Sequence, residues 1–278
     1  MSPAPDPRDG ATVTTRRIVR IAAAGGGAAD DAIAVEGALE IRVDGQSLAV
    51  TLRTPGHDRE LATGFLYTEG VVRHAADVAG AVERAAACDD EPDIIEVALA
   101  AGTPLDWSRL ERRFATTSAC GLCGRAHLDS LRAGLRPVDA GFRVDPAALL
   151  AAVAGMATAQ PGFARTGGLH AAAFLNAALA PGPLREDVGR HNAVDKVVGA
   201  LLATDALPVA AGVLWVSGRA GAEIVLKAAR AGIPVLASVG APTSLAVDLA
   251  AGARMTLAGF VRDGRMNVYA GAERLGIA

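Results

Sequence analysis

"GVLWVSGRAGAEIVLKAARAGIPVLASVGAPTSLAVDLA" (residues 212–250) is the stretch that decides the fold. Two short runs rich in Val, Leu and Ile, at 212–218 and 233–239, are typical of buried strands, and a helical pattern follows each of them. Strands that alternate with helices indicate a partly parallel sheet whose two faces are covered. We therefore predict an α/β fold with a mixed sheet and helices on both faces. Sheets of this kind bind ligands at the carboxyl ends of their strands.

Outward from this core, a helix is predicted for residues 191–203, whose Val and Leu residues share one face, and a hairpin for 256–270. Far upstream, Asp44 and Gly45 between alternating apolar residues predict a second hairpin. Strands and a helix around it indicate a smaller N-terminal α+β part. The expected organisation is a disordered tail (1–12), an N-terminal α+β subdomain (13–113) and a C-terminal α/β domain (114–278) with the C-x-x-C loop and a ligand site.

Bulk composition limits the partners. The 278 residues are 51% hydrophobic and 21% charged, which is ordinary for a soluble globular protein. A net charge of -3 gives no long-range attraction to nucleic acid, so no nucleic acid is expected as a partner. No membrane span is expected, because the longest uncharged stretches are rich in Ala and interrupted by Pro and Gly. The N-terminus lacks the features of a secretory signal, and three cysteines make no disulfide framework, so we expect a cytoplasmic protein.

Two cysteines in "FATTSACGLCGRAHLDSL" (114–131) stand at a spacing that serves metal binding, disulfide exchange or sulfur carriage. A structural zinc needs four ligands and Cys120 with Cys123 supplies two, so no metal site is expected. Zinc deaminases add an H-x-E motif, but Ala172 stands where its glutamate would be, two residues after His170. Disulfide exchange stays open, although the aromatic residue and the proline of thioredoxin-like motifs are missing.

The surroundings of this cysteine pair favour a reactive thiolate. Gly121 and Gly124 leave the backbone open, and Arg112, Arg113 and Arg125 are close in sequence. A helix that starts near Gly124 would add the positive end of its dipole, which lowers a thiol pKa from its ordinary value of about 8.5.

A second group of polar residues occurs in "REDVGRHNAVDKVVG" (185–199). Asn192 is predicted to cap the following helix, with Asp195 answering it three residues later. This interpretation leaves Arg185, Gly189, Arg190 and His191 unexplained. Cations and backbone N–H groups at the start of a helix suit a phosphate.

A similar arrangement follows a buried strand in "WVSGRAGAE" (215–223), where Ser217 and Arg219 lead into a helix. Each arrangement alone is a weak signal, because turns between strands and helices are often rich in Gly and Ser. Together with the cysteines they predict a pocket for a phosphorylated ligand. His170, on a strand expected to be buried, is interpreted as a core residue.

The motifs taken together resemble those of the formate dehydrogenase accessory sulfurtransferase (FdhD) family. The stretches that carry the resemblance are "TPGHDRELATGFLYTEGVV", "TTSACGLCG", "TGGLHAAA", "REDVGRHNAVDKVVG", "SGRAGAEIVLKAARAGIPVLASVGAPTSLAVDLA" and "GFVRDGRMNVY". They cover most of the chain beyond the tail, and the block at 185–199 is the most specific. The resemblance implies a cytidine-deaminase-like core for the mixed sheet.

What the resemblance implies about function is a persulfide relay. In the family, a cysteine desulfurase loads sulfur onto a cysteine, and the protein passes it to the molybdenum cofactor, a bis(molybdopterin guanine dinucleotide), before insertion into formate dehydrogenase. On this sequence the catalytic residues are Cys120, which bears the persulfide, and Cys123, which could expel the sulfur by forming a disulfide. The resemblance also implies a homodimer. The cofactor, as bound substrate, is expected at Arg190, His191, Ser217, Arg219, Phe260, Val261, Arg262, Asp263, Gly264 and Arg265.

Two other function classes stay open at this point. A thiol–disulfide oxidoreductase would act on protein disulfides in general, and a noncatalytic chaperone would hold the cofactor without needing the thiol. A Cys120→Ala protein separates them, because only the chaperone would keep its full activity in maturation.

Overall fold

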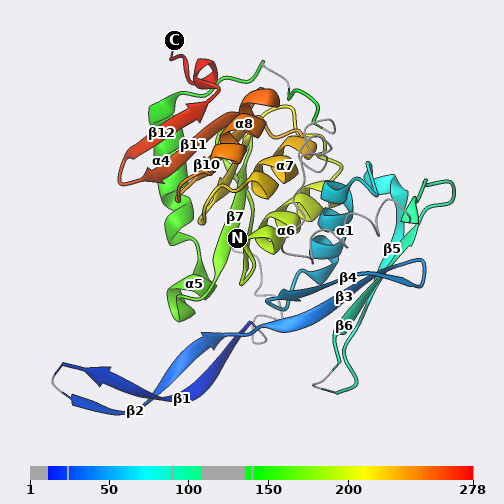
Figure 1. Ribbon diagram of the computed structural model, residues 1–278, viewed down its shortest axis with the longest axis vertical. Coiled ribbons are helices and arrows are strands. Elements are labelled where there is room, and N and C mark those ends of the chain that lie inside the picture. The colour runs from blue at the N-terminus through cyan, green and yellow to red at the C-terminus, as the bar shows by residue number, and fades with distance from the viewer. Residues whose placement is uncertain (1–11, 24, 89–90, 108–134, 139–140, 278) are drawn as a thin grey trace.

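The computed structural model describes residues 12–23, 25–88, 91–107, 135–138 and 141–277. Within these ranges the strands form a six-stranded, a four-stranded and a two-stranded sheet, with helices packed on the two larger ones (Figure 1). Every helix in these ranges is too short or too polar to span a lipid bilayer.

The six-stranded sheet carries the predicted strand–helix alternation. Its order is β12-β11-β10-β9-β7-β8, and β9, β10 and β11 run parallel while the remaining neighbours are antiparallel. The mixed sheet expected from the sequence is therefore confirmed. The strands are β7 (His170–Leu175), β8 (Pro181–Asp187), β9 (Val213–Val216), β10 (Val235–Ser238), β11 (Thr256–Arg262) and β12 (Arg265–Ala270).

Both faces of this sheet are covered, as predicted. Along β9, Leu214 and Val216 point into one apolar core and Val213 and Trp215 into another, which is the two-residue alternation of a strand. The first core contains α6 (Arg190–Ala203), α7 (Ala222–Arg230) and α8 (Ser244–Gly252), and the second contains α4 (Pro146–Thr158). In Figure 1 these helices lie on opposite sides of the sheet. Two short helices, α5 (Pro161–Thr166) and η3 (Ala272–Leu275), flank it.

The smaller sheet belongs to the N-terminal part and has the order β4-β3-β6-β5. The predicted hairpin is confirmed, because Asp44 and Gly45 take φ angles of 48° and 82° in the turn between β3 and β4. Leu39 and Ile41 point into the same core as α6, so one apolar core joins the two sheets. The elements are β3 (Gly37–Val43), β4 (Gln46–Arg53), α1 (Asp58–Glu69), η2 (Ala75–Asp77), β5 (Val78–Arg84) and β6 (Asp93–Leu99).

Helices α1 and α6 cross at very close range, which fixes the N-terminal part against the larger sheet. A Cβ built on Gly64 of α1 would lie 1.9 Å from the Asp195 carbonyl oxygen, and one on Gly199 of α6 would lie 1.9 Å from the Glu60 carbonyl oxygen. Only glycine lets the two backbones approach this far. The contact with α1 therefore fixes the position of α6, and with it the position of the first residues of α6.

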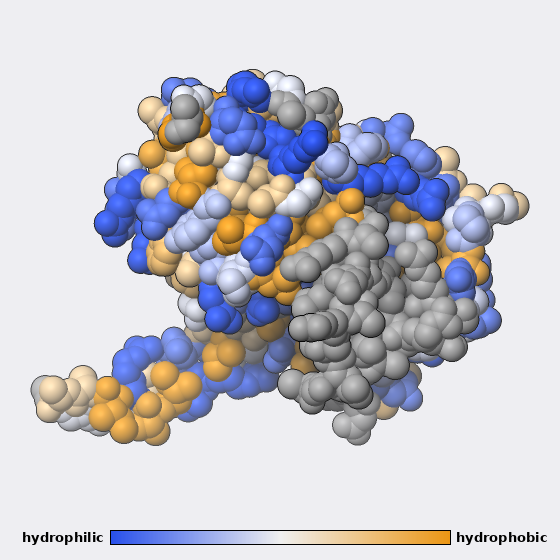
Figure 2. Space-filling view, turned by 45° about the horizontal axis from the view of Figure 1, so that its top comes forward, coloured by the Kyte–Doolittle hydropathy of each residue, from blue (hydrophilic) through white to orange (hydrophobic). Residues whose placement is uncertain are grey.

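The third sheet is a two-stranded arm, β1 (Val13–Ala22) and β2 (Gly25–Ala34). It extends away from the rest of the molecule and is the most projecting feature of its outline (Figures 1 and 2). The sequence "RRIVRIA" (16–22) predicts the strand β1, whereas no pattern in the sequence predicts β2.

Candidate functional site

The carboxyl ends of β8, β9, β10 and β11 lie at one edge of the six-stranded sheet, together with the start of β7. β8 runs in the same direction as β9, since both are antiparallel to β7, so the start of α6 reaches the same edge as the loops after β9 and β10. Backbone hydrogen bonds tie these loops together, from Gly240 N to Gly218 O (3.0 Å) and from Phe260 N to Gly240 O (3.1 Å). A Cβ on Gly240 would lie 2.9 Å from the Gly218 carbonyl oxygen, so this approach requires glycine.

The start of α6 meets the loop after β9. The helix begins at Arg190 with Gly189 as N-cap, and the Gly189 N–H donates to Asp187 Oδ1 (2.8 Å). A Cβ built on Gly218 would lie 3.4 Å from Nδ1 of His170 and 3.9 Å from the Cβ of Arg190. The start of β7, the start of α6 and the turn at Gly218 therefore meet at one point. Arg190 is half-buried there.

Arg190 and His191 bring positive charge to this point, and Asp187 brings negative charge. Burial, and then the charges of Arg190 and His191, lower the pKa of His170 below its ordinary value, so its imidazole is largely neutral at pH 7. His170 is half-buried at the edge of the sheet, in contrast to the core position expected for it. A neutral imidazole beside an arginine can donate one hydrogen bond and accept another.

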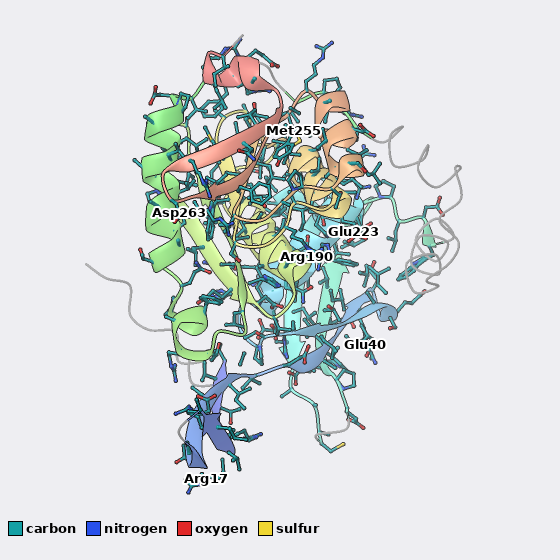
Figure 3. All side chains as sticks on the ribbon, turned by 60° about the vertical axis from the view of Figure 1, so that its left-hand side comes forward. Arg17, Glu40, Arg190, Glu223, Met255 and Asp263 are labelled. Carbon is teal, nitrogen blue, oxygen red and sulfur yellow. The ribbon has the colours of Figure 1, made fainter. Side chains whose placement is uncertain are left out.

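His191 pairs with a carboxylate that the sequence did not single out. Its Nε2 lies 2.7 Å from Oε2 of Glu223, in the first turn of α7, and this hydrogen bond lowers the pKa of Glu223. Figure 3 shows Glu223 close to Arg190, whose charge lowers the same pKa further. The pair links the starts of α6 and α7, so His191 has a positioning role in addition to any contact with a ligand.

Ser217 and Arg219 occupy the loop after β9, as predicted. The Ser217 hydroxyl accepts a hydrogen bond from the Ala171 N–H (2.8 Å), which fixes the loop against β7. That bond uses the hydroxyl as an acceptor and leaves its O–H available as a donor. Arg219 is exposed beside the glycine turn.

The segment 260–265 forms the end of β11, the turn and the start of β12. Asp263 and Gly264 take φ angles of 54° and 69° in the turn, which confirms the second predicted hairpin. Val261 is 3% exposed and packs in the core beside α4, so only its backbone can reach a ligand at the edge. Figure 3 shows Asp263 at the hairpin tip, on the side of α4. Phe260 has a φ of 53°, and its ring lies 5.9 Å from the guanidinium of Arg262, which is exposed like Arg265.

The predicted capping pair of α6 is wrong. The N-cap is Gly189, and Asn192 lies inside the helix, where its side-chain amide donates to the Leu52 carbonyl (2.8 Å) and to Asp187 Oδ1 (3.0 Å). Asp195 is buried and accepts hydrogen bonds from Lys227 (2.8 Å) and from Thr68 (2.8 Å). A tertiary ion pair therefore replaces the local capping bond.

Arg185 has a structural partner, although the sequence left it without one. It makes a two-pronged ion pair with Glu60 of α1, with Nε 2.6 Å and Nη2 2.8 Å from the carboxylate oxygens. Burial raises the pKa of Glu60, but hydrogen bonds from Arg185 and His57 lower it more, to about 2. Of the cations in the block at 185–199, Arg190 remains the one at the edge without a carboxylate hydrogen bond among the described residues.

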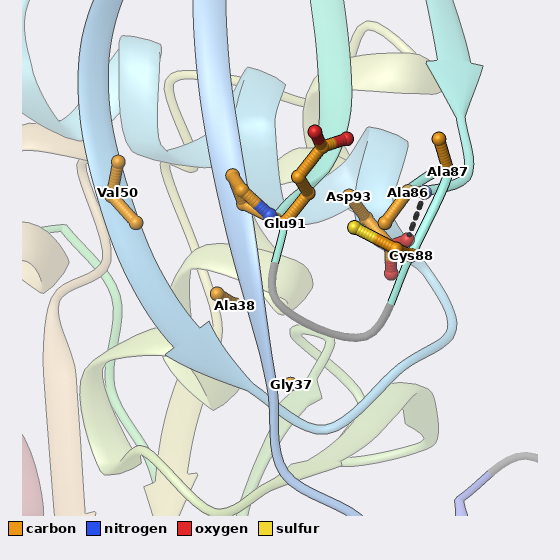
Figure 4. A pocket seen from close by; sticks show the side chains of 9 residues that line it. Gly37, Ala38, Val50, Ala86, Ala87, Cys88, Glu91 and Asp93 are labelled. Carbon is orange, nitrogen blue, oxygen red and sulfur yellow. Dashed lines mark hydrogen bonds between the residues drawn. The ribbon is translucent and has the colours of Figure 1, made fainter.

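The two predicted catalytic cysteines, Cys120 and Cys123, lie outside the described residues. Cys88 is described and is exposed in the connection between β5 and β6 of the four-stranded sheet (Figure 4). Within the ranges that the structure covers, His, Cys, Asp and Glu side chains form no group of three or more that would hold a metal ion.

Sequence reasoning missed Glu223 and the true position of His170. Glu223 could have been noticed as a carboxylate in the first turn of a predicted helix. An exposed carboxylate at that position is equally expected, because it interacts favourably with the helix dipole. Its pairing with His191 depends on where the two helix starts meet.

The sequence matches the model of the FdhD/NarQ family over residues 34–276. A sulfur carrier protein FdhD from Anaeromyxobacter dehalogenans (strain 2CP-C) is 53% identical over 263 residues, which is 91% of each chain. One of the same name from Streptomyces avermitilis is 46% identical over 274 residues, covering 96% of this chain and 97% of that protein.

A crystal structure from Desulfotalea psychrophila, described as that of a candidate formate dehydrogenase accessory protein, has a similar fold. The TM-score is 0.74 at 24% sequence identity, over 95% of this chain and 99% of the other. This likeness supports the mixed α/β architecture.

Proposed function

Because the chain belongs to the FdhD/NarQ family, we propose that it is a sulfur carrier that serves the maturation of formate dehydrogenase. The observation that carries this proposal is 53% identity with a sulfur carrier protein over 91% of both chains. Cys120 and Cys123 lie inside the matched range 34–276. The role stated for the relatives thus comes with the residues that can perform it.

The proposed loading step is an exchange between thiolates. The Cys120 thiolate attacks the outer sulfur of a persulfide on a cysteine desulfurase, so that one S–S bond breaks as another forms. The donor cysteine leaves as a thiolate, and the carrier holds the sulfur as a Cys120 persulfide. No electrons are gained or lost overall.

The proposed delivery step uses the second cysteine. The Cys123 thiolate attacks the inner sulfur of the persulfide, a Cys120–Cys123 disulfide forms, and the outer sulfur leaves as hydrosulfide to become a ligand of molybdenum. The two cysteines lose two electrons, which the sulfur gains. A dithiol reductant must then reduce the disulfide before the next cycle.

The edge of the six-stranded sheet is the proposed site of the molybdenum cofactor, a bis(molybdopterin guanine dinucleotide) that is bound as substrate. Arg190 lies beside the loop after β9, which carries Arg219, and Arg262 ends β11, two strand spacings from β9. Two spacings of about 4.8 Å are roughly 10 Å, so these arginines suit a ligand with several charged or polar groups, such as a dinucleotide, better than a single phosphate. Arginine forks and the N–H groups at the start of α6 are suited to its pyrophosphates.

Intact-mass measurement tests the proposal. Incubation with a cysteine desulfurase and cysteine is expected to add one sulfur, about 32 Da, and this gain is expected to vanish in Cys120→Ala and on treatment with a thiol reductant. A thiol–disulfide oxidoreductase would instead reduce a generic protein disulfide without gaining mass. A noncatalytic chaperone would mature formate dehydrogenase equally well with Cys120→Ala, and that result would overturn the carrier role.

A further inference from the structure

A hollow lies between α5 and the loop that precedes α1. Its volume is about 260 Å³, and its walls come from residues 54–57, from α5, from the second half of β8 and from Lys196 of α6. Residues 54–57 belong to the stretch "TPGHDRELATGFLYTEGVV", to which the proposed function gives no task. Pockets for drug-sized ligands measure about 300–1,000 Å³, so this one suits a smaller molecule. We call it the α5 pocket.

A buried lysine forms part of the wall. Lys196 lines the α5 pocket and is 1% exposed. Its Nζ lies 2.7 Å from Oδ2 of Asp187 and donates to the Thr54 carbonyl oxygen (2.8 Å). An ammonium group has three N–H donors, so within the described residues one donor of Lys196 has no acceptor. Because a buried donor without an acceptor is costly, an oxygen atom of a ligand in the pocket would supply the missing bond.

Arg165 and Glu186 bring opposite charges to the same pocket. Among the residues that the structure describes, Arg165 takes part in neither a hydrogen bond nor an ion pair. The Glu186 carboxylate accepts only backbone N–H groups, from Gly162 (2.8 Å) and Phe163 (2.7 Å). The two side chains line one pocket without pairing with each other. A ligand that carries a cation and an anion a few ångströms apart can interact with both.

The balance of charge decides between a simple anion and a zwitterion. The other two cations of the wall already have carboxylate partners. Lys196 is paired with Asp187. Arg185 is paired with Glu60. The two charges without an ion pair are opposite in sign, so the wall offers an anion little net attraction, and it suits a ligand whose own charges cancel.

The rest of the wall has an apolar part. Leu169 is 5% exposed, and it lines the pocket together with Leu184, Pro55 and Pro161. An aliphatic group that covers these side chains would be removed from water, which favours binding. The pocket thus combines separated opposite charges with a surface for a hydrocarbon side chain.

We propose that the α5 pocket binds a free α-amino acid with an aliphatic side chain. The carboxylate of the amino acid accepts the third N–H of Lys196 and pairs with Arg165, and its ammonium group donates to Glu186. The side chain lies on the leucines and prolines of the wall. Neither Arg190 nor Arg219 lines this pocket, so the site is additional to the edge proposed for the nucleotide, and it does not depend on the sulfur-carrier function.

Isothermal titration calorimetry of the full chain with L-leucine tests the class of ligand. We expect saturable binding at one site per chain, with a dissociation constant of about 1 mM or lower. N-acetyl-L-leucine lacks the ammonium group and L-leucinamide lacks the carboxylate, so each is expected to bind at least tenfold more weakly. The absence of binding by L-leucine, or an equal affinity for either derivative, would contradict a zwitterion site.

Variants test whether the ligand lies in the α5 pocket. Arg165→Met and Glu186→Gln are each expected to weaken the binding of L-leucine at least tenfold. Arg165 has no contact to lose among the described residues, so its variant should melt at the wild-type temperature. Arg84→Met, at an exposed arginine that ends β5, is the matched control and should bind as the wild type does. Wild-type affinity in Arg165→Met would refute the site, and so would competition by guanosine diphosphate, because it would assign the pocket to the nucleotide.

Discussion

Lys227 and Asp195 form a buried ion pair, with Nζ 2.8 Å from Oδ2, that joins α7 to α6. Burial raises the pKa of Asp195, so its carboxylate depends on Lys227 and on the Thr68 hydroxyl. We expect Lys227→Met to lower the free energy of unfolding by about 3–5 kcal/mol, because it leaves a buried carboxyl group without its cation. Urea unfolding followed by circular dichroism measures this, with Arg165→Met as an exposed control that should change stability by less than about 0.5 kcal/mol. A loss as small as the control's would show that the pair is not buried in solution.

Glu60 gives a prediction about acid stability. Its pKa is about 2 in the folded chain against an ordinary value of 4.5, so its contribution to stability is present above pH 4.5 and is lost as the pH falls toward 2. We expect Glu60→Gln to be less stable than the wild type at pH 7 and to lose less stability between pH 5 and 2.5. Urea midpoints at several pH values measure the difference, and Glu36→Gln on the surface should follow the wild-type curve. Parallel curves for wild type and Glu60→Gln would contradict the ion pair with Arg185.

Residues differed in how far the sequence could predict them. Ser217 and Arg219 were placed correctly at the end of a strand, because a short buried strand followed by a glycine turn has few alternatives. Asp195 was misread because the spacing from Asn192 fits a capping pattern, while its partner Lys227 is 32 residues away in the chain. Local spacing reports local hydrogen bonds, and it carries no information about a contact that only the packing of two helices creates.

At the scale of elements, the crossing of α1 and α6 depends on two glycines. Gly64→Ala or Gly199→Ala would place a methyl group 1.9 Å from a backbone oxygen of the other helix, so the helices must move apart. We expect each to destabilise the chain by about 1–3 kcal/mol, although alanine is the better helix former by about 1 kcal/mol. Gly155→Ala in α4 is the matched control, since a Cβ there meets nothing within 4 Å, and it should leave stability unchanged or raise it. Thermal unfolding of the three variants measures these effects. If Gly64→Ala and Gly199→Ala melted at the same temperature as Gly155→Ala, the close approach of α1 and α6 would be refuted.

Elements with a strong period were predicted, and elements without one were missed. β3 and β4 alternate apolar and polar residues around an Asp-Gly turn, and the structure places that hairpin where the sequence did. β2 has the sequence "GGGAADDAIA", in which Ile33 is the one β-branched residue and apolar and polar residues do not alternate, so little in it marks a strand. β2 forms because β1 pairs with it along its whole length. Such pairing depends on both segments, so the sequence of β2 alone does not predict it.

At the scale of the whole molecule, nucleotide binding at the edge of the six-stranded sheet and sulfur loading on Cys120 are expected to be independent of each other. We expect Arg190→Ala to weaken the binding of guanosine diphosphate about tenfold or more, because it removes a charge-assisted hydrogen bond to phosphate, and to leave sulfur loading on Cys120 unchanged. Isothermal titration calorimetry measures the first effect and intact mass the second. Arg84→Ala, an exposed arginine at the end of β5 in the four-stranded sheet, is the matched control for net charge. Equal losses of affinity in the two variants would show that the edge attracts nucleotide only through its overall charge, and an unchanged affinity in Arg190→Ala would move the phosphate site away from the start of α6.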